Sequence, residues 1–336
     1  MGVNIAGLFP KKEISLDDLK GKIIVIDFMN VVFQFLASIR QRDGTPLMDS
    51  AGNITSHLQG LFNRSVSLLE KGIKPIYVFD GEAPELKSKE RELRLERKLK
   101  AKEKYEIAVD EEDLDSMYKY SQQVLYLSPD MLDESKELLN ALGIPYIEAP
   151  SEAEAQCAYI CSKGDAYAVA SQDADALLFG APILVRNLTL AGSRKTGSGA
   201  IRKITPEMIK LSDVLEETGL DHEKLIILSI LVGTDFNPKG VYGIGSKKAL
   251  KLVKNTNDYD SMFDSLNVDF DWKEVYDVFE NIPVLRKYNF KFGPVDESKL
   301  KGLLVDRHEF SETRVDSVLS KLNNVKKKGQ KELFEF

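Results

Sequence analysis

Several short apolar runs along the chain each end in an acidic residue. Residues 22–27 (Lys-Ile-Ile-Val-Ile-Asp) and residues 75–81 (Pro-Ile-Tyr-Val-Phe-Asp-Gly) have the length and the β-branched and aromatic content of buried strands. Between them, residues 56–71 carry apolar side chains at helical spacing. A strand, a helix and a second strand at this spacing predict a βαβ unit, in which the two strands lie parallel in one sheet.

A third apolar run, at residues 167–170, lies between two pairs of acids. Glu152 and Glu154 come before it, and Asp173 and Asp175 follow it. Acids at the carboxyl end of such a strand lie where open α/β sheets bind their ligands. Side chains at i and i+2 of an extended segment point the same way, so the second pair converges if the chain stays extended there. Four carboxylates brought together repel one another unless cations lie among them, which makes this stretch a candidate metal site.

Helix capping is the simpler interpretation of the same acids. Ser151 and Glu154 have the spacing of a capping box, and the second acid pair could cap the next helix. For either pair alone, capping is the preferable interpretation. Another acid, Asp235, follows a long apolar run at residues 225–232, so the pattern recurs. A metal site is favoured by the seven acids taken together: Asp27, Asp80, Glu152, Glu154, Asp173, Asp175 and Asp235.

A strongly basic segment follows directly after Asp80. Residues 87–104 contain nine Lys or Arg and four Glu, with few large apolar residues. A solvated helix with i,i+4 pairs such as Glu90–Arg94 is the common explanation. The functional alternative is a cationic helical insertion tethered beside the acid cluster, which fits a phosphodiester substrate.

Two further segments have residues suited to phosphate contact. The Gly/Ser-rich loop at residues 187–203 carries Arg194 and Lys195, and either a plain surface loop or a DNA contact explains it equally well. Gly243-Ile-Gly245 opens a segment that begins with Ser246-Lys247-Lys248. Backbone N–H groups at such a helix start bind phosphate, so this segment predicts a grip on a duplex backbone.

The last eleven residues differ in character from the rest of the chain. Three lysines and a glycine at 326–329 predict a flexible linker. After it, Gln330, Leu333 and Phe336 follow at intervals of three residues. A frayed terminus is one interpretation. The other interpretation is a docking peptide, which is favoured by exposed aromatic residues on a flexible linker.

Composition narrows the class of protein. The chain has 336 residues, of which 43% are hydrophobic and 29% charged, enough for one large domain or two smaller ones. The net charge of −7 for the whole chain argues against nucleic-acid binding, but local clusters of basic residues decide such binding more than the net charge does. Two cysteines and three scattered histidines argue against a disulfide framework and a zinc site. No apolar run can cross a membrane and no signal peptide is evident, so we expect a cytoplasmic protein.

With these residues in view, the sequence resembles the structure-specific flap endonucleases of the 5′-nuclease superfamily, in their archaeal form. The resemblance covers essentially the whole chain. The motifs that carry it, in order, are Met1-Gly2, Ile26-Asp27, Gln34-Phe35-Leu36, Thr55-Ser56-His57-Leu58, Gly72-Ile73-Lys74-Pro75, Phe79-Asp80-Gly81, Ala149 to Ala155, Gln172 to Asp175, Val232 to Asp235 and Gly243-Ile244-Gly245.

The resemblance implies a role for each candidate site residue. The seven acids match the family's ligands for two Mg²⁺ ions, for which Mn²⁺ can substitute. Lys87 and Arg94 match the lysine and arginine that act on the transition state from the base of a helical arch. The residues implied in DNA contact are Gly2, Phe33, Arg40, Thr55, Arg194, Lys195, Gly243, Gly245, Lys247 and Lys248.

The resemblance also implies the architecture. We expect an α/β fold with a central, mostly parallel sheet flanked by helices, a helical arch over the active site and a helix–two-turn–helix element that binds DNA. The implied divisions are a nuclease core at 1–260, with the arch at 82–127 and the helix–two-turn–helix at 222–256, a C-terminal helical region at 261–325 packed on the core, and a clamp-binding tail at 326–336.

Several partners and ligands follow from the same resemblance. The helix–two-turn–helix commonly binds a monovalent cation such as K⁺ beside the phosphate. Arg40 and Thr55 would belong to a pocket for a one-nucleotide 3′ flap. Gln330, Leu333 and Phe336 are similar to a peptide that binds a sliding clamp of the PCNA type. We therefore expect a monomer that acts on branched DNA with a 5′ flap, a nick or a gap, without membrane association.

The sequence departs from the family pattern at three places. Phe33 stands where a tyrosine often stacks on the base beside the scissile phosphate, so stacking is kept and a hydroxyl contact is lost. His308 stands where some relatives have a lysine in the 3′-flap pocket, which makes that contact sensitive to pH. The clamp peptide usually ends in two aromatic residues, and here only Phe336 follows at the right spacing.

The expected activity is two-metal-ion hydrolysis near the junction of a 5′ flap, leaving a 5′-phosphate, with 5′–3′ exonuclease activity, in Okazaki fragment maturation and DNA repair. Carboxylate ligands select hard cations. A haloacid-dehalogenase-type phosphatase is a rival, but it needs Asp-x-Asp after the first strand, and Phe28, Met29 and Asn30 follow Asp27. A catalytically inactive DNA-binding or clamp-scaffold protein is a second rival, against which the presence of all seven acids argues.

Overall fold

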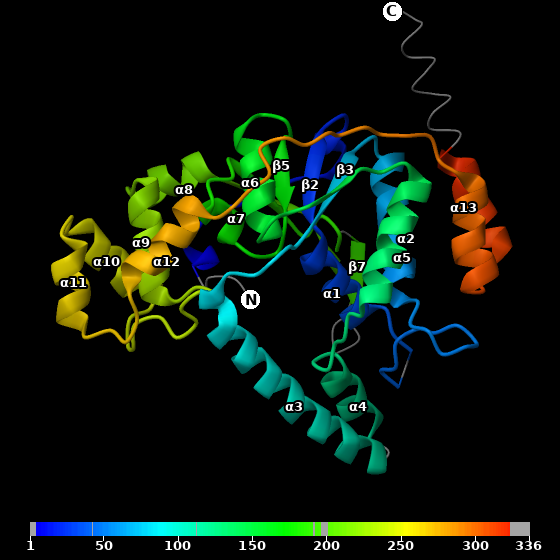
Figure 1. Cartoon of the computed structure of the whole chain (residues 1–336), viewed down its shortest axis with the longest axis horizontal. Helices are drawn as coiled ribbons and strands as arrows, with labels where there is room; N and C mark the ends of the chain where they lie inside the picture. The colour runs from blue at the N-terminus through cyan, green and yellow to red at the C-terminus, as the bar shows by residue number, and fades with distance from the viewer. Residues whose placement is uncertain (1–4, 42, 112, 191, 196–200, 323–336) are drawn as a thin grey trace, which may run out of the picture.

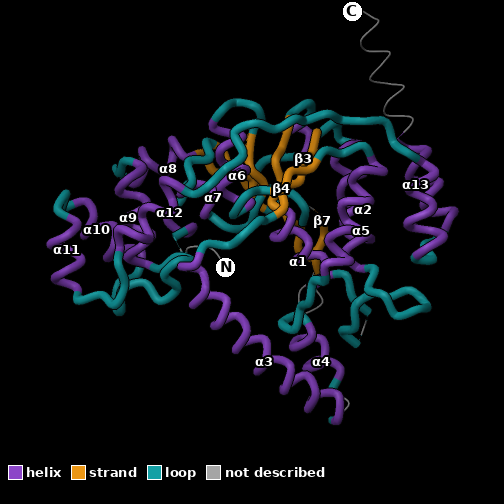
Figure 2. The backbone as a smooth tube through the Cα atoms, in the orientation of Figure 1, coloured by secondary structure: helices purple, strands orange, loops and turns teal. Residues whose placement is uncertain are grey.

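The computed structural model describes residues 5–41, 43–111, 113–190, 192–195 and 201–322. Within these residues a seven-stranded sheet runs through the middle of the molecule in the order β1-β9-β6-β5-β2-β3-β4 (Figures 1 and 2). Its strands are β1 (Lys12–Glu13), β2 (Ile23–Asp27), β3 (Lys74–Phe79), β4 (Tyr146–Glu148), β5 (Ala168–Ala170), β6 (Ile183–Arg186) and β9 (Glu207–Lys210). A separate antiparallel pair joins β7 (Gly192–Lys195) and β8 (Ile201–Ile204).

The sheet is mixed and mostly parallel, as predicted. The neighbours β6, β5, β2, β3 and β4 all run parallel, whereas β9 is antiparallel to β6 and β1 is antiparallel to β9. The predicted βαβ unit is confirmed, because β2 and β3 pair in parallel and α2 (Ser56–Glu70) connects them. The carboxyl ends of these five parallel strands therefore meet at one edge.

Alternation of side chains along the strands divides the core into two layers. In β2, Ile24 and Ile26 face one layer of helices and Val25 faces the other. The first layer contains α1 (Phe28–Ser38), α2, α5 (Pro129–Leu142), α13 (Glu297–Lys301) and the π-helix η4 (Gly302–Arg307). The second layer contains α6 (Ala153–Ser162), α7 (Asp175–Leu178) and α9 (His222–Val232), and α6 carries the buried free thiols Cys157 and Cys161.

The remaining helices lie mainly at one end of the second layer. They are α8 (Leu211–Thr218), α10 (Ser246–Lys254), α11 (Tyr259–Leu266) and α12 (Trp272–Asn281), with the short 3₁₀ turns η1 (Ala6–Leu8), η2 (Leu16–Leu19) and η3 (Glu85–Lys87) elsewhere. Aromatic contacts hold α12 in place, since Phe279 packs against both Phe179 and Phe236. Within the described residues no helix is both long and apolar enough to span a membrane.

An extended segment at residues 282–296 crosses the molecule from α12 to α13 (Figure 1). The buried Gln156 of α6 holds its first part through two hydrogen bonds with the Leu285 backbone, of 2.6 and 3.1 Å. Farther along, the Gly293 N–H donates to the Gly143 carbonyl at 2.9 Å. We call residues 282–296 the crossing segment.

One long helix, α3 (Ser88–Asp110), projects away from the sheet and packs along α4 (Leu114–Ser121) (Figure 1). Its charged sequence leaves it little to bury, and only Glu90, Ala101 and Ala108 in it are buried. Its base lies next to the acidic edge of the sheet described below, which follows from the short connection between Asp80 and η3.

Candidate active site

Three of the acids lie at the carboxyl edge of the sheet because the strands that precede them are parallel neighbours. Asp27 is the last residue of β2, Asp80 follows β3, and Asp173 comes shortly after β5. Asp27 also accepts a hydrogen bond of 3.1 Å from the Asn30 N–H, so it caps α1 while its side chain remains 94% buried, with 6% exposed.

A close backbone approach brings the end of β3 to the start of α6. The Gly81 N–H donates to the Ser151 carbonyl at 2.7 Å, and a Cβ added at Gly81 would lie 2.1 Å from the Ala149 oxygen. Only glycine fits this contact. Asp80 then accepts a hydrogen bond of 2.7 Å from the Ala153 N–H, which fixes its carboxylate beside Glu152.

The capping box, which is the alternative interpretation of the first acid pair, is excluded. The N-cap of α6 is Glu152, and its side chain makes no capping hydrogen bond. Ser151 instead donates to the Glu82 carbonyl at 2.8 Å. Glu154, in the first turn, accepts from the Ser171 hydroxyl at 3.0 Å. Both glutamates are therefore turned toward the sheet edge and not toward the backbone of their own helix.

The chain does not stay extended through Asp173 and Asp175. Helix α7 begins at Asp175, after an Ala174 N-cap with αR geometry and no side-chain cap. The two acids nevertheless meet the others, since both raise the pKa of Glu154 through their charge.

Burial and mutual repulsion show how closely the acids are gathered. Burial, and then the charge of Asp80, raise the pKa of Asp27 from 3.8 to about 8. Loss of hydration, followed by repulsion from Asp175 and Asp27, raises the pKa of Glu154 well above its ordinary value. Asp235 joins the group through its charge interaction with Glu152. Seven carboxylates in one place need positive charge among them.

Two cations from the base of α3 partly supply that charge. Lys87 forms an ion pair with Glu152, and its Nζ lies 3.7 Å from an oxygen of Asp235. Burial alone would lower the pKa of Lys87, but the charges of Glu152 and Asp235 raise it above its usual value. Arg94 donates to Asp235 at 2.9 Å and also pairs with Glu90, as the i,i+4 spacing predicts. The base of α3 is thus not merely a solvated helix.

Sequence reasoning missed two polar residues in this network. Asn30 donates to Asp173 at 3.1 Å, and Ser171 donates to Glu154 at 3.0 Å. The buried Glu90 accepts from Arg94, as the sequence predicts. One oxygen of Glu90 has no hydrogen-bond partner within the part of the chain that the structure describes. Single polar residues have no periodicity, although the Asp27-x-x-Asn30 spacing at a helix start is a weak signal for one of them.

The donor set fits hard divalent cations, because it consists of carboxylate oxygens. As the side chains stand, no three His, Cys, Asp or Glu among the described residues have the arrangement that would hold a metal ion. Their oxygens are turned instead toward Lys87, Arg94 and hydrogen-bond donors. The residues fit such ions in chemistry and position, and the conformation seen is one in which protein cations compensate part of the acidic charge.

The residues expected to contact a 3′ flap are not all in one place. Thr55 and His308 line a cavity of about 620 Å³, together with Phe310 and Arg314. Arg40 is not among the residues lining it, and donates to the carbonyls of Leu36 and Gly44, each at 2.6 Å. Phe33 is partly buried against the α1 layer.

His308 is held between two carboxylates. Its Nδ1 lies 3.0 Å from Asp49 and its Nε2 lies 3.1 Å from Glu134, which also contacts Nε2 of His57 at 3.1 Å. A neutral imidazole has one donor and one acceptor, whereas ionised carboxylates only accept. Both ring nitrogens of His308 thus face carboxylate oxygens.

The predicted phosphate-binding segment, Gly243–Gly245, lies at the start of α10. Gly243, with φ of 73°, makes the turn, and Gly245 is the N-cap of α10. Lys247 and Lys248 in the first turn of α10 are exposed. Arg194 and Lys195 are residues of β7. Outside the described residues lie Gly2, Gln330, Leu333 and Phe336.

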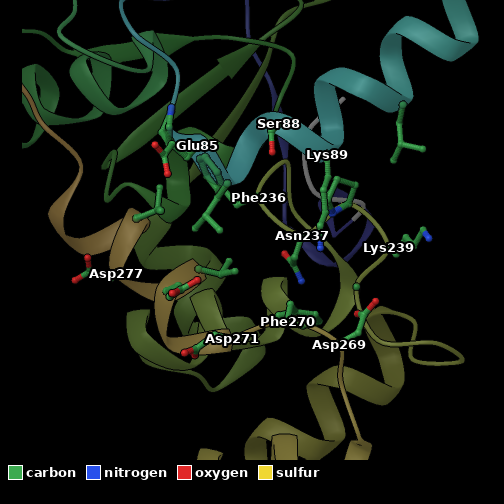
Figure 3. A pocket seen from close by; sticks show the side chains of 18 residues that line it. Glu85, Ser88, Lys89, Phe236, Asn237, Lys239, Asp269, Phe270, Asp271 and Asp277 are labelled. Carbon is green, nitrogen blue, oxygen red and sulfur yellow. The ribbon is translucent and has the colours of Figure 1, made fainter.

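A second cavity, of about 900 Å³, lies beside the base of α3 (Figure 3). Ser88 and Lys89 of α3 lie on one side of it, and Asn237 and Phe270 lie on the other. Its residues include neither Lys87 nor Arg94, which are turned to the acids. Neighbouring lysines of α3 thus face different surroundings.

Comparison with known proteins agrees with this geometry. Residues 5–101 match the family model of the XPG N-terminal domain, and residues 143–235 match that of the XPG I-region. Flap endonuclease 1 of Pyrococcus furiosus is 48% identical over 336 residues, which cover 100% of this chain and 98% of the relative. The enzyme of the same name from Aeropyrum pernix is 46% identical, covering 96% of this chain and 94% of its own.

Solved structures show the same fold. The structure of flap endonuclease-1 from Methanococcus jannaschii superposes with a TM-score of 0.77 at 43% identity, covering 96% of this chain and 98% of the other. The catalytic core of Rad2 in complex with DNA substrate, at 22% identity, has a TM-score of 0.70 and covers 96% of this chain and 100% of its own. Because it is 46–48% identical to the flap endonuclease 1 proteins of Pyrococcus furiosus and Aeropyrum pernix over nearly its full length, the chain belongs to the flap endonuclease 1 family of structure-specific, metal-dependent 5′ nucleases.

Proposed function

We propose that the chain hydrolyses a phosphodiester bond near the junction of a 5′ flap, has 5′–3′ exonuclease activity on nicked or gapped DNA, and serves Okazaki fragment maturation and DNA repair. One observation carries the proposal. Lys87 and Arg94, at the base of the projecting helix α3, form ion pairs with Glu152 and Asp235 in the acid cluster. A site that gathers acids for metal ions and cations for a phosphate suits phosphodiester hydrolysis.

The seven acids would hold two Mg²⁺ ions, for which Mn²⁺ can substitute. Glu152, Glu154, Asp173 and Asp175 would supply most of the direct ligands. The buried Asp27, together with Asp80 and Asp235, would position the ions or their waters. When bound, two such ions activate a water and stabilise the leaving oxygen of an in-line displacement.

Lys87 and Arg94 would act on the substrate. In the conformation seen here they neutralise Glu152 and Asp235. Divalent ions among the acids would take over this neutralisation, so that both side chains become available to the oxygens of the reacting phosphate. There they would balance the negative charge that grows in the transition state.

The projecting helices would organise the DNA. We assign α3 and α4 to a helical arch within residues 82–127, through which a 5′ flap would reach the acids. Phe33 would stack on the base next to the scissile phosphate. The cavity lined by Thr55 and His308 would receive a one-nucleotide 3′ flap. Arg40, which lies outside that cavity, would contact the neighbouring DNA backbone.

The duplex would be held at a distance from the chemistry. Residues 222–256 would form the helix–two-turn–helix, where the Gly243–Gly245 turn and the exposed Lys247 and Lys248 would bind backbone phosphates. A monovalent cation such as K⁺ would join this contact. Arg194 and Lys195 would add a further phosphate contact, and Gly2 would lie near the DNA.

The rest of the chain would support docking. Residues 1–260 would be the nuclease core and residues 261–325 a helical region packed on it. The tail at 326–336 would bind a sliding clamp of the PCNA type through Gln330, Leu333 and Phe336. The enzyme would act as a cytoplasmic monomer on branched DNA. A DNA complex of the Rad2 catalytic core, which shares this fold, supports DNA as the substrate.

The test is cleavage-site mapping on end-labelled flap, nick, gap and bubble DNA, with Mg²⁺ or with EDTA. We expect the main cut near the junction of the 5′-flap substrate, a 5′-phosphate on the nicked duplex and no product in EDTA. Equal cutting in EDTA would refute the metal-dependent mechanism. Preferred cutting of bubble DNA would refute the flap assignment while leaving the nuclease chemistry intact.

A further inference from the structure

We propose that Asn30 and Ser171 are positioning residues that hold the carboxylates of Asp173 and Glu154 in register for divalent cations. The inference rests on the proposed function, because it assumes that these two acids bind metal. It assigns a role to two uncharged side chains that lie behind the acids.

Asn30 bridges two strands of the sheet through the first turn of α1. Its Nδ2 donates to Asp173 at 3.1 Å, and its Oδ1 accepts from the Gln172 N–H at 3.2 Å. Its own N–H donates to Asp27 at 3.1 Å. One residue therefore fixes the acid that ends β2 relative to the loop that follows β5.

Ser171 makes the corresponding link to α6. The side chain is buried, with 3% exposed, and its hydroxyl donates to Glu154 at 3.0 Å. The same oxygen accepts from the Asp173 N–H at 3.2 Å. Asn30 and Ser171 thus connect one acid of each pair, Asp173 and Glu154, through a continuous set of hydrogen bonds.

The chemistry of these side chains suits the task. A carboxamide and a hydroxyl each donate and accept, so they can join a carboxylate to a backbone amide without adding charge. Each donor occupies one lone pair of a carboxylate and leaves the others for a cation. An aspartate at position 30 would instead add an eighth negative charge, and an aliphatic residue would leave Asp173 without this donor.

The same helix provides a matched control. One turn after Asn30, Gln34 accepts a hydrogen bond of 2.6 Å from the Thr189 hydroxyl. This bond also joins α1 to a loop beyond the sheet, but it touches none of the seven acids. Asn30→Leu and Gln34→Leu therefore each remove one amide of similar size from α1, and only the first change reaches the acid cluster.

The experiment measures Mn²⁺ binding to the full chain without DNA, by electron paramagnetic resonance of the free ion. We expect Asn30→Leu to weaken binding roughly 10–100-fold, the usual effect of removing a group that orients a metal ligand. Asn30→Gln, which keeps the amide, should retain more affinity. Gln34→Leu should bind as the unaltered chain does. In single-turnover cleavage, Asn30→Leu should need more Mg²⁺ for half-maximal rate, with unchanged DNA affinity.

Folding is checked by thermal unfolding of every variant. If Asn30→Leu does not fold, Ser171→Ala tests the same network by removing one hydroxyl, and it should weaken Mn²⁺ binding in the same direction. Unchanged Mn²⁺ binding in the folded variants, or equal weakening by Gln34→Leu, would overturn the inference. In either case a metal-dependent unaltered chain leaves the proposed function standing. Failure of the unaltered chain to bind Mn²⁺ would overturn both.

Discussion

Replacing Lys87 with methionine separates the two tasks that the structure gives to this side chain. Lys87 pairs with Glu152, and only 16% and 9% of the two side chains are exposed. Removing one partner of a buried ion pair costs about 3–5 kcal/mol, because the remaining charge has lost its compensation. We therefore expect Lys87→Met to lower the free energy of unfolding by about 3 kcal/mol in EDTA. The loss should shrink in excess Mg²⁺, since ions that bind only the folded chain stabilise it.

The cleavage rate should not recover in the same way. Preorganised donors at a reacting centre contribute about 2.7–4 kcal/mol, so the single-turnover rate should fall about 10²–10³-fold even at saturating Mg²⁺. DNA affinity should change little, since the proposed duplex contact lies near Gly243. The assays are denaturant unfolding with and without Mg²⁺, and rapid-quench cleavage of a labelled flap. Lys89→Met is the control, because the exposed Lys89 lines the cavity beside the base of α3. Equal rate losses in both variants, or no loss in Lys87→Met, would refute the reasoning.

Three other changes test separate parts of the molecule. Asp175→Ala should nearly abolish cleavage and spare DNA binding measured by fluorescence anisotropy, whereas joint loss of binding and folding would assign Asp175 a structural role. Hydrogen bonds from Asn53 lower the pKa of Asp49 from 3.8 to about 2. Burial opposes this shift, and His308 adds a smaller lowering. A lowered acid pKa contributes stability that is present above pH 3.8 and lost as the pH falls toward 2, so Asp49→Asn should flatten the fall of the denaturation midpoint in that window. An equally steep fall in the variant would contradict this assignment. Deleting residues 329–336 should leave flap cleavage unchanged and remove stimulation by a sliding clamp, and persistent stimulation would place the clamp contact elsewhere.

The sheet and the membership of the acid cluster could be predicted because each depends on a local pattern. The runs that become β2 and β3 are apolar, short and followed by Asp27 and Asp80. Parallel pairing then brings both acids to one edge whatever the connections do. The gathering of acids does not depend on the exact conformation after β5, so it occurs although the chain is not extended through Asp173 and Asp175.

The arrangement of side chains within the site could not be predicted in the same way. Ser151 and Glu154 fit a capping box equally well, and it is excluded only by the N-cap position of Glu152 in α6 and the contact of Ser151 with Glu82. The bonds of Asn30 and Ser171 join residues from different elements, and no local pattern encodes them. Arg40 and Thr55 are close in sequence, yet the bonds of Arg40 to Leu36 and Gly44 keep its side chain out of the cavity that Thr55 lines.

The crossing segment has a consequence for the order in which the molecule assembles. Gln156 and Leu285 are 129 positions apart in the chain, and Asp165 and Tyr288, which share a hydrogen bond of 2.6 Å, are 123 apart. Contacts at such separation form late, because a long loop must close first. During synthesis the sheet and α6 emerge well before the crossing segment. The side chain of Gln156 should therefore stay hydrated until the crossing segment binds it. The amide of Leu285 should accordingly exchange with deuterium sooner than the amides of β2, in a partial opening that leaves the acid cluster intact.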